Sequence, residues 1–430
     1  MTHLDGRRAY REGPMSAQER HILVIGAGIL GLSSAWYLLE RGARVTILDR
    51  EPIRDAASCG NAGLISLGHP PLTRPGVSIQ GLKWMFDKRS PLYIKPRLDG
   101  DLARWLWTFH RHCTRSHYEG TMEVLCELGR LSADCFESIL AETAIDCDWQ
   151  RRGWDDVCLH ESSLDHAEEE AGLLARFGFH SERVDGDTLR AEAPAYTDAV
   201  RGAIRFEDSA TLSPQAFTAG LARELEARGA TIRTDCTVET ILLRGDRVEG
   251  VRLEDGEELT AEATVLAAGV WSDQLARAIG LRIPMQPARG YHRDLVGLES
   301  MPPRGCVLNE TFIAVSPFHD TLRLAGTLEL SGFDAPWLDD RLAHLTTAGS
   351  RYLRGVDTAT VTQEWAGYRP CTADGMPVVG AVPRRPGLYV GTGHAMMGMT
   401  LGPASGRLIA EAIYEQAPAL DSPLLAAARY

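Results

Sequence analysis

The chain has 430 residues, a formal net charge of −13 and an apolar fraction of 44%. This length allows two or three domains of ordinary size, and the acidic balance argues against binding to nucleic acid. The longest apolar runs have the length of strands, so we expect no membrane-spanning helix. Nine cysteines at irregular spacing predict neither a disulfide framework nor a metal site, which favours a reduced, cytoplasmic compartment. Residues 1–19 are polar and without period, which predicts a disordered tail.

Residues 21–50, HILVIGAGILGLSSAWYLLERGARVTILDR, predict a strand, a helix and a second strand. Gly26, Gly28 and Gly31 occupy the G-x-G-x-x-G positions. There they allow a tight turn, the close approach of a pyrophosphate and the packing of helix on strand. Asp49 ends the second strand, where an acid binds ribose hydroxyls, so NAD or FAD is favoured over NADP.

The middle of the chain is less regular. Residues 80–200 show helical periods and few strands, and residues 216–229 predict an amphipathic helix that ends at a glycine. Residues 230–269 hold strand-like pieces with two turn signals, which predict a small antiparallel meander. Residues 387–416 predict a strand, a glycine-rich turn and a helix. We therefore expect non-contiguous pieces of the chain to build the nucleotide-binding domain.

Several stretches together resemble the D-amino-acid/glycine oxidase superfamily of FAD-dependent amine oxidoreductases. They appear in that family's order and are residues 24–50, NAGLIS (61–66), TVLAAGVWS (264–272), GTLELSG (326–332), WAGYRPCTADGMPVVG (365–380) and GTGHAMMGMTLGPASGRLIAE (391–411). Residues 61–96 look most like the bacterial D-amino-acid dehydrogenase small subunit, in a group that also includes hydroxy-D-proline dehydrogenases.

The resemblance implies an α/β fold of mixed α+β character. Its FAD-binding domain would be Rossmann-like and discontinuous, with an inserted substrate domain built on an antiparallel sheet. The implied ranges are 20–95, 200–280 and 362–430 for the FAD-binding domain, and 96–199 and 281–361 for the substrate domain.

The resemblance also implies FAD, held without a covalent bond. The implied contacts are Gly26, Gly28 and Gly31 at the pyrophosphate, Asp49 and Arg50 at the adenosine ribose, Asn61, Ala62, Gly63 and Leu64 along the flavin ring, Val238 at the adenine, Ala268, Gly269 and Trp271 on the pyrophosphate side, and Gly393, His394, Met397, Gly398, Met399 and Thr400 at the flavin pyrimidine ring. A helix N-terminus at that ring would stabilise the negative charge of a reduced flavin. Ala395 stands where the family usually has glycine, so the turn is strained if its φ is positive.

Arg369 lies between Tyr368 and Pro370 in a stretch that otherwise resembles buried sheet and turn. Its match to the family's motif implies that it binds the α-carboxylate of the substrate, and a guanidinium fork suits that task because it donates two parallel hydrogen bonds. The alternative is an internal salt bridge to Glu364 or Asp374.

Other substrate contacts are less defined by the sequence. Tyr291, followed by His292 in RGYHRDL, could donate its hydroxyl to the carboxylate or could simply pack in the core. His69 in SLGHPP is a further candidate. No general base is required if the amine arrives neutral.

The resemblance implies a D-amino-acid dehydrogenase. It would transfer a hydride from Cα of a D-amino acid, or of a cyclic one such as hydroxy-D-proline, to flavin N5, giving an imine and then a 2-oxo acid. No lysine follows Lys95, so the lysine with which some sarcosine-oxidising relatives activate oxygen is absent, and we expect another electron acceptor. Two alternatives stay open: an oxygen-using oxidase of glycine, sarcosine or D-amino acids, and a flavin subunit of a larger electron-transfer complex.

Residues 81–109 contain all three lysines of the chain together with Trp84, Trp105 and Trp107. Basic residues beside aromatic ones suit a membrane interface, where a quinone could take the electrons at the inner face of the cell membrane. The alternative is a core helix with charges on its outer surface.

Overall fold

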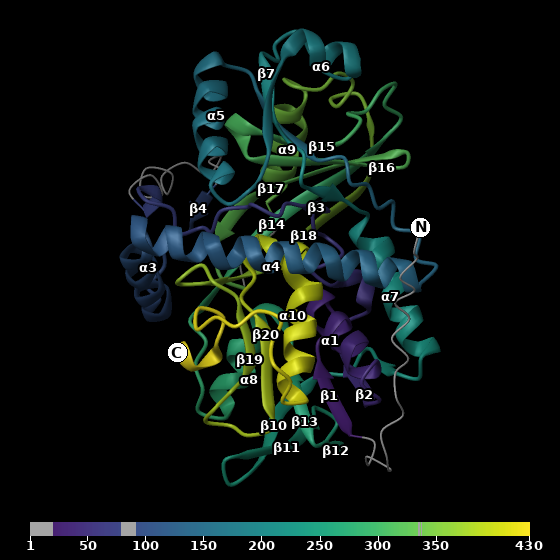
Figure 1. The fold of residues 1–430 in the computed structure, drawn as a ribbon, viewed down its shortest axis with the longest axis vertical. Coiled ribbons are helices and arrows are strands. Elements are labelled where there is room, and N and C mark those ends of the chain that lie inside the picture. Colours follow the sequence, from purple (N-terminus) through teal and green to yellow (C-terminus); the bar gives the residue numbers. More distant parts are fainter. Residues whose placement is uncertain (1–19, 79–91, 334–335, 337) are drawn as a thin grey trace, which may run out of the picture.

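A computed structural model of the chain describes residues 20–78, 92–333, 336 and 338–430. The predicted tail and residues 81–91 of the predicted membrane segment lie outside this part. Two sheets dominate the described structure, and the long helix α4 (Arg115–Glu142) lies across the molecule between them (Figure 1).

The first sheet has six strands in the order β19-β20-β13-β1-β2-β9. Neighbouring strands are parallel, except that β19 is antiparallel to β20. β1 leads through α1 (Ile29–Leu39) to β2, which confirms the predicted strand–helix–strand unit. The strands are β1 (His21–Ile25), β2 (Arg44–Leu48), β9 (Thr231–Arg233), β13 (Ala263–Leu266), β19 (Val378–Ala381) and β20 (Leu388–Thr392).

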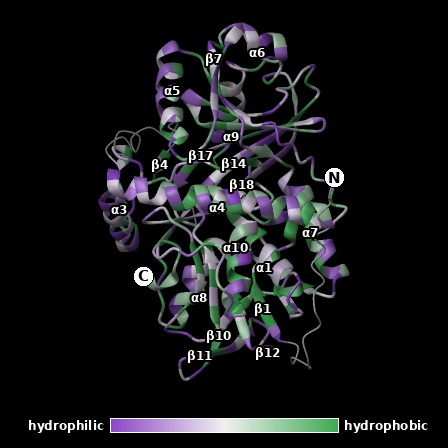
Figure 2. Cartoon of the chain, viewed as in Figure 1, coloured by the Kyte–Doolittle hydropathy of each residue, from purple (hydrophilic) through white to green (hydrophobic). Residues whose placement is uncertain are grey.

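Both faces of this sheet are buried, because its strands are apolar on both sides. Ile22 and Val24 belong to a core cluster with residues of α1 and of α10 (Gly398–Ile413), whereas Leu23 and Ile25 belong to a cluster on the opposite face. Figure 2 colours β1 largely as hydrophobic. The second cluster includes residues of the predicted meander, which forms a three-stranded antiparallel sheet of β10 (Val238–Arg244), β11 (Arg247–Leu253) and β12 (Glu258–Thr260).

The second sheet has nine strands, eight of them in the order β18-β14-β17-β16-β15-β5-β7-β6, and β4 also pairs with β17. Its neighbours are antiparallel except for the pairs β15–β5 and β17–β4. Leu342 and Leu345 of α9 (Asp339–Gly349) pack against one of its faces. The strands are β4 (Leu92–Ile94), β5 (Trp154–Cys158), β6 (Ser181–Asp185), β7 (Gly202–Phe206), β14 (Met285–Val296), β15 (Gly305–Leu308), β16 (Ile313–Phe318), β17 (Thr321–Leu330) and β18 (Thr360–Thr372).

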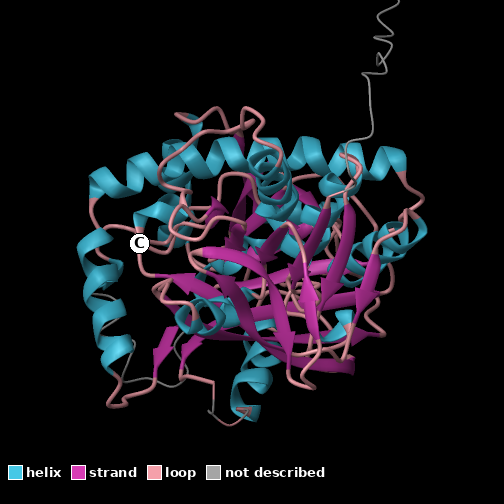
Figure 3. Ribbon diagram, turned by 90° about the horizontal axis from the view of Figure 1, so that it is seen from below, coloured by secondary structure: helices cyan, strands magenta, loops and turns pink. Residues whose placement is uncertain are grey.

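The helices cover the outer faces of these sheets. α4 packs on α10, and a layer of helices lies along one side of the strands in Figure 3. The other helices of the described residues are α3 (Gly100–His112), α5 (Glu161–Ala175), α6 (Gly186–Glu192), α7 (Pro214–Ala227) and α8 (Ser272–Ala278). A short sheet pairs β3 (Leu64–Ile65) with β8 (Ala210–Thr211). α7 confirms the helix predicted over 216–229. Among the described helices, none is both long and apolar enough to cross a bilayer.

Sheet membership differs from the predicted domain ranges at three strands. β4, β7 and β18 pair within the large sheet, although the ranges predicted for the FAD-binding domain, 20–95, 200–280 and 362–430, contain β4, β7 and most of β18. Each of these strands has a partner far away in the sequence, β17 for β4, β5 for β7 and β14 for β18, and such pairing leaves no local signal. The division into two domains remains our proposal, with these three strands on the side of the large sheet.

One buried arginine fixes the loop around residue 60 to the large sheet. Arg323 of β17 is only 2% exposed. Its guanidinium donates to both carboxylate oxygens of Asp294, at 2.8 and 2.9 Å. Its Nη1 also donates to the carbonyl oxygens of Cys59 and Asn61, each at 2.9 Å. A loop that the sequence predicts to border the flavin is therefore held by a strand of the other sheet.

Arg323→Ala should lower the free energy of unfolding by about 3–5 kcal/mol, because it leaves the carboxylate of Asp294 buried without its partner. Urea denaturation followed by tryptophan fluorescence measures the loss. The matched control is Arg115→Ala, which removes an exposed ion pair with Glu119 at 3.0 Å and should have a much smaller effect. Equal losses in the two variants would show that the buried pair contributes no more than a surface pair.

Candidate functional site

A cavity of about 1790 Å³ is lined by residues of both sheets. Sites for small molecules usually have about 300–1,000 Å³, so this cavity has room for a dinucleotide together with a smaller ligand. Its wall includes the N-termini of α1 and α10, the end of β2 and one face of the large sheet.

The turn between β1 and α1 brings the backbone close to the cavity. Gly26 has a φ of +109°, and a Cβ at Gly31 would lie 1.8 Å from the carbonyl oxygen of Gly26. Gly28 borders the cavity and precedes the first residue of the helix, where Ser58 Oγ accepts the N–H of Ile29 at 2.9 Å. The helix thus begins at the cavity wall, where its N–H groups and partial positive charge favour an anion such as a phosphate.

An acidic side chain is fixed where β2 ends. Asp49 Oδ2 accepts the N–H of Ala27 at 2.6 Å, and Oδ1 accepts the N–H of Glu51 at 3.0 Å. Arg50, the next residue, places its guanidinium carbon 3.7 Å from the ring centroid of Trp271. The geometry suits a ribose at the carboxylate, since its oxygens are held at the cavity edge.

Most of the predicted cofactor residues border the cavity. They are Gly26, Gly28, Asp49, Arg50, Asn61, Ala62, Leu64, Val238, Ala268, Gly269, Trp271, His394, Met397, Gly398, Met399 and Thr400. Gly31, Gly63 and Gly393 are not part of its lining; a Cβ at these positions would lie 1.8, 2.2 and 2.6 Å from a neighbouring atom. These three glycines therefore serve close packing behind the wall.

The turn before α10 joins the cavity wall to β18. Cys371 and His394 form an isolated antiparallel bridge, and His394 Nε2 lies 2.8 Å from Ser405 Oγ. Burial lowers the pKa of His394 to about 3, so this imidazole is neutral at physiological pH. Ala395 has a φ of +48°. This positive φ is easily adopted by glycine but strained for alanine, so the turn is strained at this residue.

One face of the large sheet forms the floor of the cavity. Residues paired across neighbouring strands point to the same face. The paired row that crosses from β18 to β5 is Trp365, His292, Ala325, Ala314, Val307 and Asp156. Trp365 stacks on His292 with ring centroids 5.2 Å apart. Ala325 and Ala314 have small side chains and so leave space above this part of the sheet.

Arg369 lies on this floor, four residues after Trp365 in β18, and borders the cavity. Its Nη1 donates to the carbonyl oxygen of Thr327 at 2.7 Å. Burial lowers the pKa of Arg369 below its usual value, since the charged form loses water. Nevertheless, a guanidinium stays protonated in proteins, and its other N–H groups can bind an anion.

The predicted alternative of an internal salt bridge for Arg369 is wrong. Glu364 pairs with Arg293, and Asp374 pairs with Arg429 at 2.8 Å. Among residues 20–78, 92–333, 336 and 338–430, no carboxylate lies within ion-pair distance of Arg369. Arg369 is half-buried in the cavity wall, and a cation that has lost part of its water is costly without an anion, so this arrangement points to an anionic ligand.

Two glycines make room for the side chains on the floor. A Cβ at Gly290 would lie 2.2 Å from Nη1 of Arg369, and a Cβ at Gly367 would lie 2.1 Å from the ring of Trp365. The two glycines are paired across β14 and β18. Sequence reasoning missed them, because only the register of the two strands shows what lies above each glycine.

Thr327 supplies the carbonyl that orients Arg369, and it does so from a strained backbone. Its φ is +63°, which is an outlier for a β-branched residue. The pairing of β14 with β17 is irregular nearby, between Arg289 and Tyr291. Strain of this kind is typical of functional sites, but the sequence gives no signal of it.

The structure corrects the expectation for Tyr291. Its hydroxyl donates to Glu329 Oε2 at 3.0 Å, and its ring packs in the core cluster with Leu342 and Leu345 of α9. Neighbouring residues of a strand point to opposite faces of the sheet, and Gly290 lies on the same face as Arg369. Tyr291, the next residue, therefore points to the opposite face. The hydroxyl is therefore not directed at a carboxylate on Arg369, although Tyr291 borders the cavity.

His69 borders the cavity as expected. Its Nδ1 lies 2.7 Å from the carbonyl oxygen of Pro70, and burial lowers its pKa to about 4. The imidazole is therefore neutral at physiological pH, with Nδ1–H donating to that carbonyl. A catalytic role for His69 stays a prediction.

Comparison with known families agrees with this site. A model of the DAO family, described as FAD dependent oxidoreductase, matches residues 21–412. The chain belongs to this family. This membership confirms the resemblance stated from the sequence and shows that FAD is the cofactor of this oxidoreductase. The glycine turn, the acid at the end of β2 and the two helix N-termini fit that cofactor.

Solved structures share the fold of this FAD-dependent oxidoreductase at low identity. Glycine oxidase from Bacillus cereus ATCC 14579 has a TM-score of 0.75 and 21% identity, and the match covers 93% of this chain and 96% of that chain. Iminodiacetate oxidase from Chelativorans sp. BNC1 has a TM-score of 0.70 and 23% identity, with coverages of 94% and 98%. An L-amino acid deaminase from Proteus vulgaris without its specific insertion sequence has a TM-score of 0.70 and 20% identity, with coverages of 99% and 99%. The likeness confirms the predicted fold class.

Gly290→Ala should weaken the binding of a simple carboxylic acid such as benzoate, because the added methyl group displaces the guanidinium of Arg369. Loss of one charge-assisted hydrogen bond predicts a Kd about 10- to 100-fold higher. Titration of the flavin difference spectrum measures this Kd in the FAD-loaded enzyme.

The matched control is Gly172→Ala in α5, where an added Cβ meets no atom within 4 Å. It should leave the Kd unchanged. An unchanged Kd in Gly290→Ala as well would mean that the acid binds away from Arg369.

Proposed function

We propose that this FAD-dependent oxidoreductase is a D-amino-acid dehydrogenase, which oxidises a D-amino acid or a cyclic one such as hydroxy-D-proline. The observation that carries the proposal is Arg369, a cation without a carboxylate partner among the described residues, on the floor of the cavity. The resemblance of residues 61–96 to the bacterial D-amino-acid dehydrogenase small subunit supports the D configuration.

The names of the structural neighbours are consistent with an amine that carries a carboxylate. Glycine, iminodiacetate and L-amino acids appear in them. A carboxylate accepts two parallel hydrogen bonds from a guanidinium, and this contact fixes the orientation of the atoms attached to it. Arg369 is thus suited to hold Cα in one place, and positioning is the main contribution that the protein makes to such a reaction.

Bound FAD supplies the hydride acceptor, and we propose that it is held without a covalent bond. We propose that the turn at Gly26 and Gly28 holds its pyrophosphate, that Asp49 binds the ribose, and that residues 61–64 and 393–400 border the flavin. The substrate loses a hydride from Cα and a proton from its amine and becomes an imine. For a primary amine, water then converts the imine to a 2-oxo acid and ammonia, whereas a cyclic amino acid gives a cyclic imine, whose nitrogen stays bonded to its carbon chain. Arg369 keeps the carboxylate in place.

Two alternatives stay open, and the names of the structural neighbours support one of them. Two of the neighbours are named as oxidases, which favours an enzyme that passes electrons to oxygen; release of peroxide during turnover in air would identify it. The other candidate is a flavin subunit of a larger electron-transfer complex. Turnover of the isolated chain with an artificial acceptor would exclude the need for such a complex.

Arg369→Ala should lower kcat/KM about 30- to several-thousand-fold, because it removes one partner of a desolvated charge pair. Arg369→Lys should recover only part of the loss, since an ammonium cannot form the fork. Anaerobic bleaching of the flavin by D- and L-amino acids measures the effect, and FAD released by acid measures the cofactor content.

The control for these variants is Arg252→Ala, which removes a cation that pairs with Glu258 in the small sheet. Its kcat/KM should match that of the parent enzyme. Loss of FAD in Arg369→Ala, or a parent enzyme that no amino acid reduces, would overturn the proposal.

We further propose that the enzyme contacts the inner face of the membrane through α3 and passes electrons to a quinone. Trp107 is 60% exposed, Leu98 just before the helix is fully exposed, and Arg111 lies with its guanidinium carbon 4.8 Å from the Trp107 ring centroid. Trp105, in contrast, is 5% exposed and belongs to the core, so it does not contribute to such a surface. Lys95 is exposed as well, whereas Lys83, Trp84 and Lys88 lie outside the described residues.

Replacing Leu98 and Trp107 together by serine should weaken binding to anionic vesicles at low salt about 10-fold or more, because each side chain loses its apolar contact. Sedimentation with vesicles of phosphatidylserine and phosphatidylcholine measures it. Leu243→Ser, at a residue of β10 that is 38% exposed, is the control. A parent enzyme that does not sediment would rule out the membrane contact.

A further inference from the structure

The cavity wall next to Arg369 is apolar over a continuous group of side chains, which we call the apolar chamber. These side chains come from α3, β4, the end of β17 and the loop that follows β3. They are Leu72, Leu92, Ile94, Trp105, Leu106, Phe109, Leu328 and Leu330. All of them belong to, or pack against, one hydrophobic cluster.

Two contacts place the apolar chamber beside the guanidinium. Trp105 Nε1 donates to the carbonyl oxygen of Cys371 at 2.9 Å, and Cys371 follows Arg369 by two residues on the same side of β18. β4 pairs with β17 from Leu328 onward, directly after Thr327, whose carbonyl holds Arg369. A ligand whose carboxylate lies on Arg369 therefore has the apolar chamber within reach of its next atoms.

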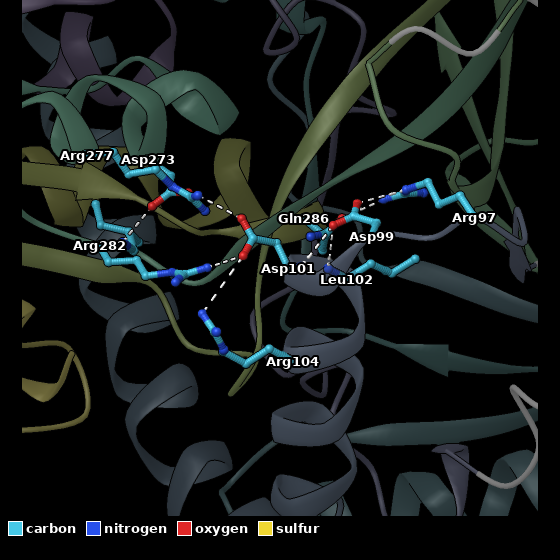
Figure 4. Close-up of polar contacts among 10 residues, drawn as sticks. Arg97, Asp99, Asp101, Leu102, Arg104, Asp273, Arg277, Arg282 and Gln286 are labelled. Carbon is cyan, nitrogen blue, oxygen red and sulfur yellow. Dashed lines mark hydrogen bonds and ion pairs between the residues drawn. The ribbon is translucent and has the colours of Figure 1, made fainter.

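The helix that forms one wall of the apolar chamber is fixed at its N-terminus (Figure 4). Asp99 caps α3 by accepting the N–H groups of Asp101 and Leu102. Arg97 donates to Asp99, to Leu330 O and to Gln286 Oε1 at 2.8–2.9 Å, which ties the cap to β17 and β14.

A second set of contacts in Figure 4 ties α3 to the nucleotide-binding side. Arg277 of α8 donates to Asp101 and Asp273, each at 2.7 Å, and Arg282 also pairs with Asp101. α3 is thus held from two sides of its N-terminus.

The chemistry of the apolar chamber selects against polar groups. Trp105 and Phe109 stack with ring centroids 5.0 Å apart, and the one polar atom of Trp105 is already bonded to Cys371. A polar side chain entering here would lose water without gaining a partner, whereas an apolar one gains from burial.

We propose that the apolar chamber takes the side chain of the substrate, so that the preferred substrates are amino acids with a large apolar side chain, of the leucine, methionine and phenylalanine class. Glycine leaves the apolar chamber empty, and aspartate or lysine places a charge in it. This inference rests on the proposed function, because it assumes that the substrate carboxylate lies on Arg369.

Carboxylic acids without an amine test the inference independently of turnover. In the series from acetate to hexanoate, each added methylene should lower the Kd for the FAD-loaded enzyme about fourfold, measured by flavin difference spectra. A Kd that does not depend on chain length would overturn the inference, and it would do so even if amino acids reduce the flavin.

Leu106→Arg should abolish this dependence and raise the kcat/KM for D-glutamate relative to D-leucine at least about 10-fold, because it puts a cation into the apolar chamber. The control Ala103→Arg adds the same cation at an exposed position of α3 and should leave the ratio unchanged. Phe109→Ala is the second variant. It should lower the kcat/KM for D-phenylalanine about 10-fold or more with little effect on D-alanine.

The outcomes separate the two proposals. In the parent enzyme we expect the kcat/KM for D-leucine and D-phenylalanine to be about 10-fold or more higher than the kcat/KM for D-alanine. The kcat/KM for D-aspartate should be lower than that for D-alanine. Flavin reduction that depends on Arg369 but favours glycine, aspartate or lysine would overturn the apolar chamber as the side-chain site and leave the proposed function standing. An enzyme that no amino acid of either configuration reduces would overturn the proposed function itself.

Discussion

The cavity depends on the buried fork between Arg323 and Asp294. This pair belongs to the large sheet, yet the same guanidinium holds the carbonyl groups of Cys59 and Asn61. A second contact in the same place, between His292 Nδ1 and the carbonyl oxygen of Gly60 at 3.0 Å, repeats the connection. The floor with Arg369 and the loop opposite are therefore fixed to one strand pair, so that the distance between them does not rely on a flexible linker.

The chemistry on that floor rests on places where the chain has small or strained residues. Gly290 and Gly367 give the guanidinium and the indole their room, and Thr327 and Ala395 adopt a positive φ that costs about 1–3 kcal/mol each. Such costs persist only where the surrounding packing determines the backbone. Here that packing comes from the regular elements on both sides, β14, β17 and β18 for the threonine and α10 for the alanine.

The sequence predicts the parts of this site that are local. The turn at Gly26, the acid at Asp49 and the motif around Arg369 lie within short stretches, whose residues determine one another's geometry. Contacts that depend on strand register are not visible in this way, and Gly290 and Thr327 were missed for that reason. Trp105 was predicted to face a membrane, because the sequence does not show which side of α3 packs on β18. Tyr291 was misplaced by the same limit. One residue decides which face of a strand a side chain occupies, and an irregular pairing lies directly before it. Similarly, nothing in the sequence of β18 shows that its neighbour in the sheet is β14.

The order of strands in the first sheet has a consequence for how the enzyme is made. β1 and β2 are made early, but their sheet also needs β13 and β20. The face of α1 (Ile29–Leu39) is covered by α10, which begins only at Gly398. Contacts between such distant segments form slowly, and apolar surface stays exposed until they form. The nascent chain therefore carries an uncovered nucleotide-binding motif through almost all of its synthesis. The site for FAD is complete only once α10 has been made, so the whole cofactor can be bound only when synthesis of the chain is almost finished.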